Sequence, residues 1–307
     1  MKEEFEYRIT NGSACVTRIL TPGAVCVIPD RLEGVPVTEL GDRLFSGMET
    51  EEIFLPDSLK KIGRYVFYNC EKLKILHFSD GIAETGAGLF SGCRNIQEFL
   101  VHMNGRRSSA LKDFVTEFSG RLTVRCFFRH QDGSWQESAR LIFPQYYDEA
   151  VENTPARIIS SSIHGSGQKY RYCFDNGMLR YDRYDRLFAE EQYEESTSAA
   201  AEVALGRLMY PLELREDAKY AYERFLRENL TEVMLEKMED SETFLWMLDR
   251  FGQKKAEAAG TFSCGLRPEE LDRLIAGASE RRQAGILSRL MEFRHRWFRT
   301  EKKKFEL

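Results

Sequence analysis

Large apolar residues recur in the first hundred residues at a spacing too long for one helix or one strand. A glycine followed four positions later by phenylalanine occurs three times, at Gly41 and Phe45, Gly63 and Phe67, and Gly86 and Phe90. The glycines are therefore 22 and 23 residues apart. This period is typical of a solenoid, in which each repeat buries its apolar face only against its neighbours.

The strands between these motifs predict which side chains point outward, because side chains alternate along a strand. We assign to the buried side Ile53, Leu55, Leu76, Phe78, Phe99 and Val101. The first outward row is then Val27, Phe54, His77 and Leu100, and the second is Val25, Glu52, Ile75 and Glu98. Most of the first row is apolar, so we expect either a partner or the chain's own helical region to cover it.

The segments beside the repeats predict further strands and one helix. Residues 1–24 form a strand pair about Asn11-Gly12, a strong hairpin signal, and should cap the solenoid. Apolar residues in 111–118 fall on one face of a helix. A second hairpin is expected over 122–143, with Asp132-Gly133 at its turn. Residues 145–192, rich in Tyr, Arg and Asp, give no clear pattern.

From about residue 196 the apolar spacing becomes helical. The stripes are Ala201, Leu205, Leu208 and Met209; Ala218, Ala221, Tyr222, Phe225 and Leu226; Leu230–Met238; Phe244–Phe251; and Leu271, Leu274, Ile275, Ile286, Leu287, Leu290 and Met291. Pro268 suits the first turn of a helix, where its missing N–H costs nothing. A tight link at 280–282 predicts that the last two helices form a hairpin.

The repeat motifs resemble the BspA-like (Treponema pallidum type) leucine-rich repeats. The matching segments are Val27-Ile28-Pro29, Phe45-Ser46-Gly47, Phe67-Tyr68-Asn69-Cys70 and Phe90-Ser91-Gly92-Cys93. The resemblance covers about residues 5–101, and it departs from the family pattern at Met48 and Ser79. The last helical stripes faintly resemble ankyrin-type hairpins, although the usual ankyrin motif is absent and generic α-hairpins fit equally well.

Together these patterns predict an α+β chain in three parts. Residues 1–103 are expected to form a short BspA-type solenoid with its N-terminal β-hairpin cap. Residues 104–192 should form a mixed α/β connecting module, and residues 193–307 an all-α region of helical hairpins. The resemblance implies a bacterial-type protein that works as an interaction scaffold.

Composition and charge indicate the cellular compartment of the protein. The chain has 307 residues and a net charge of −5, with no apolar run long enough to span a membrane. Its first residues are acidic and lack a secretory pattern, so we expect a cytoplasmic protein. The seven cysteines, Cys15, Cys26, Cys70, Cys93, Cys126, Cys173 and Cys264, include no CxxC pair. Reduced core thiols explain them better than a zinc site or a catalytic thiol.

Catalytic and cofactor motifs are missing from the sequence, so we expect no enzyme, no metal and no cofactor. The nearest approach to a ligand site is a possible anion-binding set of His164, Gly165, Ser166, Gly167, Lys169 and Arg171. The alternative is a flexible loop followed by an amphipathic strand. Residues 281–307 carry nine Lys and Arg against three Glu. A last helix docked through Trp297 and Phe298 explains this tail better than nucleic-acid binding does.

Two functions follow from the sequence. The first is a non-catalytic scaffold that binds a protein or peptide through the solenoid face, with Phe54 and Leu100 as anchors and Glu52 and Glu98 as polar neighbours. The alternative is a small-anion-binding or enzymatic module in residues 145–192, for which the solenoid would be a platform.

Overall fold

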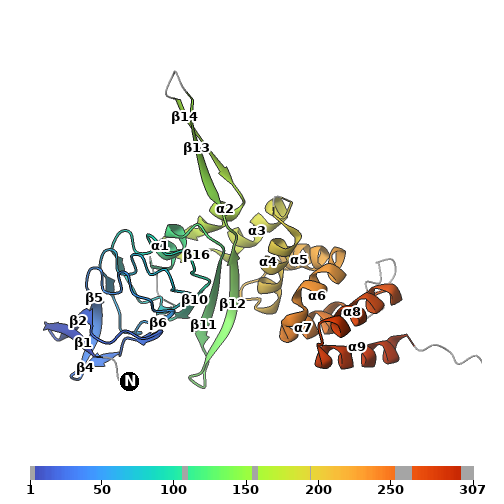
Figure 1. The fold of residues 1–307 in the computed structure, drawn as a ribbon, viewed down its shortest axis with the longest axis horizontal. Coiled ribbons are helices and arrows are strands. Elements are labelled where there is room, and N and C mark those ends of the chain that lie inside the picture. The colour runs from blue at the N-terminus through green and yellow to red at the C-terminus, as the bar shows by residue number, and fades with distance from the viewer. Residues whose placement is uncertain (1–3, 106–109, 154–157, 194, 253–264, 299–307) are drawn as a thin grey trace, which may run out of the picture. The chain divides into compact units, whose positions relative to one another are not determined.

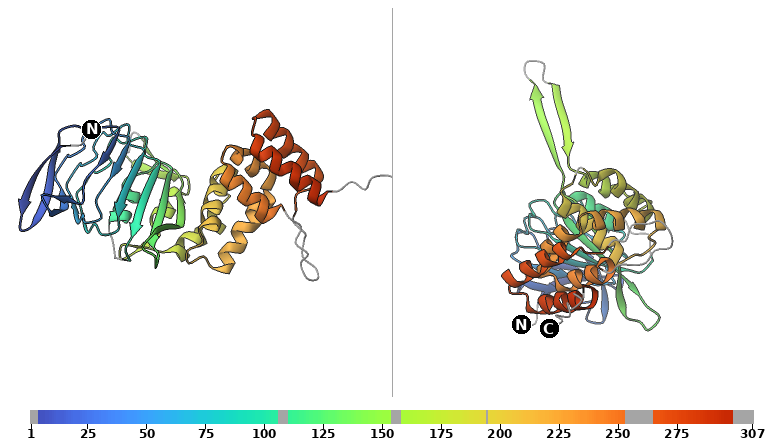
Figure 2. Two further views of the ribbon diagram at one scale, coloured as in Figure 1. Left: turned by 90° about the horizontal axis from the view of Figure 1, so that it is seen from below. Right: turned by 90° about the vertical axis from the view of Figure 1, so that its right-hand side faces the viewer.

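The computed structural model describes residues 4–105, 110–153, 158–193, 195–252 and 265–298. The chain forms two compact units. Unit 1 comprises residues 1–195 and 206–219, and unit 2 comprises residues 196–205 and 220–307. Figures 1 and 2 show strands and short helices in unit 1 and helices in unit 2.

Successive turns of the repeat array in unit 1 contribute strands to two sheets. The first sheet has the order β1-β2-β5-β7-β9, with β4 paired to β5. Its strands are β1 Phe5–Thr10, β2 Ser13–Ile19, β4 Arg31–Leu32, β5 Val35–Leu40, β7 Lys61–Ile62 and β9 Glu84–Thr85. The second sheet has the order β12-β11-β10-β8-β6-β3. Its strands are β3 Val25–Val27, β6 Glu52–Phe54, β8 Ile75–Ser79, β10 Glu98–Met103, β11 Leu122–Arg129 and β12 Trp135–Phe143.

The solenoid core is a column of stacked phenylalanines. The rings of Phe45 and Phe67 lie 5.6 Å apart, and those of Phe67 and Phe90 lie 5.2 Å apart. Helix α1, Ala110–Glu117, ends the column, because its Phe114 packs edge-on against Phe90 at 5.2 Å. Each repeat therefore buries its ring against the next, and α1 supplies the apolar surface that a further repeat would have supplied.

Buried thiols follow the same register. The Cys70 thiol donates a hydrogen bond to the Phe45 carbonyl at 3.0 Å, and the Cys93 thiol donates to the Phe67 carbonyl at 2.9 Å. No disulfide joins the cysteines of the described ranges. The thiols thus act as small core residues that bridge adjacent turns, as the sequence predicts; Cys264 lies outside the described residues.

The repeated glycines mark places where adjacent turns approach most closely. A Cβ atom added to Gly86 would lie 2.5 Å from both the carbonyl carbon and the oxygen of Gly63. At Gly63 it would lie 2.7 Å from the amide nitrogen of Asp42, whereas at Gly41 the nearest atom would be the Val16 oxygen, at 3.2 Å. Only glycine therefore fits at the inner two positions without moving the backbone of the preceding turn.

The predicted caps are present. Strands β1 and β2 form an antiparallel hairpin about Asn11 and Gly12, both with positive φ, and β2 pairs in parallel with β5. At the other end, β10 pairs in parallel with β11, and β11 pairs antiparallel with β12 through the turn at Asp132-Gly133. The second sheet thus runs without a break from the repeats into the predicted hairpin over 122–143.

The rest of unit 1 follows β12 in the sequence. Its elements are β13 Tyr147–Asn153, β14 Ile158–His164, α2 Gly167–Arg171, β15 Phe174–Asp175, β16 Met178–Leu179 and α3 Tyr181–Glu191. Of these, helices α2 and α3 pack against β12. The buried Tyr184 of α3 bonds through its hydroxyl to the amide and the carbonyl of Ile142. Pro211 pairs with Ala139 at the free edge of β12, and the buried Arg207 holds Asp185 of α3 at 2.6 Å.

Unit 2 consists of helices at the predicted positions. They are α6 Leu230–Glu236, the 3-10 turn Lys237–Glu239, α7 Ser241–Phe251, α8 Pro268–Glu280 and α9 Ala284–Trp297. Two helices belong to both units: α4, Thr197–Met209, begins in unit 2 and ends in unit 1, and α5, Glu216–Glu228, begins in unit 1 and ends in unit 2. Pro268 is the first residue of α8, and Arg282, with φ of 57°, makes the tight link before α9. Buried Leu271, Leu274, Ile286 and Leu290 join α8 to α9.

These observations confirm the α+β class with a capped solenoid and a helical C-terminal part. The three-part division at residues 103 and 192 stays a prediction, and so does the ankyrin-like character of the last helices. Within the described ranges, no helix is long and apolar enough to cross a membrane.

The glycine column gives a stability prediction. We expect Gly86→Ala to lower the free energy of unfolding by about 1–3 kcal/mol, because the new methyl group must displace backbone. Gly41→Ala, where the nearest atom is 3.2 Å away, should cost clearly less. Urea unfolding of the two variants measures the difference, and equal losses would contradict a graded backbone contact.

Candidate protein-binding face of the repeat array

The second sheet brings the predicted outward rows together in register. Val27 is the partner of Phe54, Phe54 of His77, and His77 of Leu100 across parallel strands. We call these four residues the outer row. The next partner in line is Arg125 on β11. Residues that alternate with the outer row along the strands, such as Ile53 and Phe99, are fully buried. The structure therefore has the inward and outward faces that the sequence predicts.

The second outward row lies two positions earlier on each strand. Val25 pairs with Glu52, Glu52 with Ile75, and Ile75 with Glu98. We call these residues the flanking row. Val25 and Val27 are 48% and 51% exposed, and the others in both rows are partly buried by their neighbours along the row. The predicted partner-binding residues therefore form one continuous surface across β3, β6, β8 and β10.

Two contacts order the centre of this surface. The ring of His77 stacks on Phe54 with centroids 3.8 Å apart, and its Nε2 lies 2.7 Å from Glu52 Oε1. Burial lowers the pKa of His77 below its ordinary value, although the Glu52 carboxylate acts in the opposite direction. At neutral pH the imidazole is therefore uncharged, and the middle of the outer row presents an aromatic surface.

Beyond Leu100 the same face becomes ionic. Glu137 is almost buried between two arginines, with its carboxylate oxygens 2.7 Å from Arg125 and 2.6 Å from Arg140. Burial raises the pKa of Glu137, but the hydrogen bonds from Arg140 and Arg125 outweigh burial and hold this pKa below its usual range. Arg140 also donates to the Tyr210 hydroxyl at 2.8 Å. This group fixes the C-terminal limit of the apolar surface.

Sequence reasoning missed this ionic end, because it followed the repeats only as far as β10. The signal was present: Arg125 lies between the buried Val124 and Cys126, with the alternation of the earlier strands. His102 forms a further missed group, since its ring stacks on Trp135 at 4.3 Å and its Nδ1 lies 3.1 Å from Asp57. The face therefore combines an apolar N-terminal part with an aromatic and charged C-terminal border.

The predicted anion-binding set has a different arrangement. Arg171 is 1% exposed, and its guanidinium donates to the carbonyls of Phe118, Pro144 and Gly167 at 2.6–2.8 Å and to that of Gly120. Burial lowers its pKa to about 10, so the group stays protonated at neutral pH. Four of its five N–H groups are thus committed to backbone, and Arg171 joins α2 to the end of α1.

Two other members of this set, Ser166 and His164, contact carboxylates of the chain itself. The amide and hydroxyl of Ser166 both donate to Glu195 Oε1, at 2.9 and 2.6 Å. His164 lies 3.0 Å from Glu149, whereas Lys169 is on the exposed surface of α2. The turn at Gly165 to Gly167 therefore binds the carboxylate of Glu195. Binding of a small anion at this turn stays a prediction.

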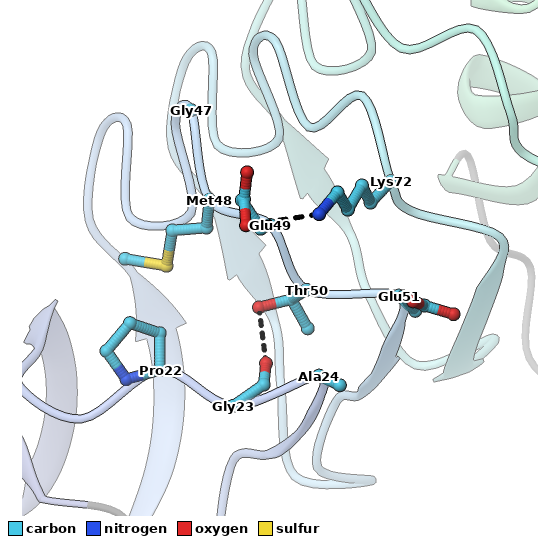
Figure 3. Close-up of a pocket in the computed structure, with 9 residues that line it drawn as sticks. All are labelled: Pro22, Gly23, Ala24, Gly47, Met48, Glu49, Thr50, Glu51 and Lys72. Atoms are coloured by element: carbon cyan, nitrogen blue, oxygen red, sulfur yellow. Dashed lines mark hydrogen bonds and ion pairs between the residues drawn. The ribbon is translucent and has the colours of Figure 1, made fainter.

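A cavity of about 560 Å³ opens on the repeat array (Figure 3). Its lining residues are Pro22, Gly23, Ala24, Gly47, Met48, Glu49, Thr50, Glu51 and Lys72. Thr50 donates to the Gly23 carbonyl at 3.0 Å, and Lys72 pairs with Glu49 at 3.1 Å. Glu51 pairs with Lys74 at 2.6 Å, so these polar side chains all bind groups of the chain itself.

Two observations in the described ranges concern metal and thiol chemistry. No cluster of three or more His, Cys, Asp or Glu side chains there is placed to hold a metal ion. Burial raises the pKa of Cys126 and of Cys173 to about 12, so neither thiol is ionised at neutral pH. Of the basic C-terminal segment, Trp297 ends α9 with its ring 6.2 Å from Phe293, and residues 299–307 lie outside the described residues.

Comparison with known proteins identifies the repeats. Residues 34–110 match the family described as "BspA type Leucine rich repeat region (6 copies)". This confirms the resemblance found in the sequence. No curated protein matches the chain.

Three solved structures show partial similarity to the chain. They are a leucine rich cell surface protein from Faecalibacterium prausnitzii (20% identity, TM-score 0.29, 36% of this chain and 32% of that one), a leucine-rich repeat protein from Bacteroides ovatus (26%, 0.29, 34% and 30%) and the T. pallidum leucine rich repeat protein (19%, 0.23, 31% and 68%). The chain spans about a third of the length of the first two.

The His77 contact predicts a pH effect on stability. Because the folded state holds the pKa of His77 below about 6.5, the unfolded chain binds the proton more readily, and stability falls as the pH drops below that value. His77→Gln should flatten this fall between pH 7 and 5 in urea unfolding. The same substitution at exposed His130 is the control, and equal pH slopes in wild type and His77→Gln would contradict the interpretation.

The Arg171 contacts predict a structural role. Arg171→Met should lower the free energy of unfolding by at least about 3 kcal/mol, because it leaves several buried carbonyls without a donor. Lys169→Met, on the exposed side of the same helix, should change it by no more than about 0.5 kcal/mol. Thermal and urea unfolding measure both, and a stable Arg171→Met protein would favour a binding role over a structural one.

Proposed function

We propose that this BspA-type leucine-rich repeat array makes the chain a non-catalytic scaffold that binds a protein or peptide through the outer and flanking rows. Leucine-rich repeat arrays are generally protein-interaction scaffolds without catalytic activity. The single observation that carries the proposal is the alignment of the apolar residues Val25, Val27, Phe54, Ile75 and Leu100 on four adjacent strands, around the His77–Glu52 pair.

An exposed apolar surface of this kind argues for a partner. Val25 and Val27 are about half exposed, although valine is usually buried in a soluble protein. Scattered apolar residues on a surface need no explanation, but residues in register on adjacent strands form a patch, and patches of this kind mark interaction sites. Anchor residues at the centre of such a patch supply most of the binding energy. Phe54 and Leu100 are the anchors in this proposal.

Polar groups around the patch would set specificity. Glu52 already bonds to His77, and Glu98 lies 3.8 Å from Arg125. A partner that covers the rows must therefore preserve or replace these contacts, since a buried carboxylate without a partner is costly. The ionic group at Glu137 adds a charged border, which favours a partner with an apolar centre and a polar rim.

The cytoplasmic location is part of the same proposal. It is supported by the cysteines, none of which forms a disulfide within the described ranges, as expected in a reducing compartment. One of the similar proteins, that of Faecalibacterium, is described as a cell surface protein, and the description applies to that protein alone.

The test compares two equivalent substitutions at leucine. Leu100→Asp places a carboxylate at a proposed anchor, and Leu20→Asp places one at a leucine that is 44% exposed outside the two rows. Affinity capture from lysate of the source organism, followed by titration of the captured partner, should show binding weakened about 30-fold by Leu100→Asp and little changed by Leu20→Asp. Equal binding by both variants would overturn the proposal, and circular dichroism must show that both are folded.

A further inference from the structure

Strands β13 and β14 form a hairpin that stands apart from the sheets of the solenoid. They pair antiparallel over seven residue pairs, from Tyr147 with His164 to Asn153 with Ile158. In the part of the chain that the structure describes, neither strand pairs with any third strand. Figure 1 shows the hairpin as a two-stranded ribbon that extends from unit 1 near α2.

An isolated ribbon of this kind is unusual in energetic terms. Two strands alone are marginally stable in water, and three or more strands or a packed face are normally needed. Each strand also has one outer edge with backbone N–H and C=O groups directed away from the hairpin. Such an edge is a template for another strand unless charge or proline protects it.

The two outer edges differ in their protection. Strand β13, Tyr-Asp-Glu-Ala-Val-Glu-Asn, has three carboxylates and no basic residue. Strand β14, Ile-Ile-Ser-Ser-Ser-Ile-His, has no carboxylate, lysine, arginine or proline. Its His164 already lies 3.0 Å from Glu149 of β13. The β13 edge is thus protected by charge, whereas the β14 edge has the neutral, β-branched composition of a strand that pairs.

We propose that the β14 edge binds β14 of a second copy of this chain. In an antiparallel arrangement about a twofold axis through Ser161, Ser161 is the partner of Ser161 in the other copy, and Ile159 is the partner of Ile163. The strand is therefore complementary to itself at both positions, as an interface between identical copies requires. Ile163, which is 46% exposed, is among the residues that this pairing would cover.

The charges of β13 explain why the assembly stops at two. The four-stranded sheet that results, β13-β14-β14-β13, has the carboxylates of Asp148, Glu149 and Glu152 on both outer strands. Like charges on facing strands are destabilising, so these edges do not pair with further copies. A head-to-tail contact of β14 with β13 would instead leave an open edge and generate filaments.

The experiment measures the oligomeric state of the full chain by sedimentation velocity over a wide range of concentrations. At high concentration the measured mass of the wild-type protein should approach twice the chain mass of 35.7 kDa. The double substitution Ser160→Lys/Ser161→Lys places ammonium groups opposite each other across the twofold axis and should raise the dimer dissociation constant at least about 10-fold. Ala150→Lys/Val151→Lys changes the same rungs of the hairpin on β13 and is the matched control, expected to dimerise as wild type does.

Amide hydrogen exchange supplies a second readout. Residues 158–163 should exchange more slowly at high protein concentration in wild type and in the control, but not in the β14 variant. A wild type that stays monomeric at all concentrations overturns the proposal. So does equal dissociation of the two variants, or growth beyond the dimer. Slow exchange on β14 that appears only with a different protein bound would assign the edge to that protein and overturn the second copy.

Discussion

The close approach of successive turns at Gly63 and Gly86 is the constraint on which the repeat array depends. These contacts leave no room for a side chain, so each turn has one position relative to the turn before it. The phenylalanine column then falls into contact at 5.2–5.6 Å, and the buried thiols reach the carbonyls of the preceding turn. Since a slip of one residue would send every buried strand residue to the opposite face, the glycine contacts also determine which residues face outward.

The same register is visible on the surface. Lys72 pairs with Glu49, Lys74 with Glu51, and Arg64 with Asp42, each 22 or 23 residues apart. These pairs are exposed and contribute little to stability individually. These ion pairs therefore reflect the register of the turns but do not determine it. The outer row depends on it more directly, because Phe54, His77 and Leu100 form one surface only while their strands stay aligned.

Local patterns were sufficient to predict most of the fold. The hairpin at Asn11-Gly12, the helix over 110–117 and the start of α8 at Pro268 each depend on residues close in sequence. The outward rows were also predictable, because the period of the repeat carries one strand onto the next. What could not be predicted depends on contacts between distant residues. Nothing near Arg171 indicates that its partners are the carbonyls of Phe118 and Pro144, nor does Ser166 indicate Glu195.

The spacing of side chains in the outer row also determines which type of secondary structure can match it along its length. Neighbouring strands are about 4.8 Å apart, so the row offers side chains at that interval. A helix laid along the row presents one side chain per turn of about 5.4 Å, and over the four strands it drifts from the row by only about 2 Å. In an extended strand, side chains on one face are about 6.8 Å apart. This spacing differs from that of the outer row by about 2 Å at each strand of the solenoid that the partner crosses. The pitch of this solenoid therefore favours a helical partner over an extended one.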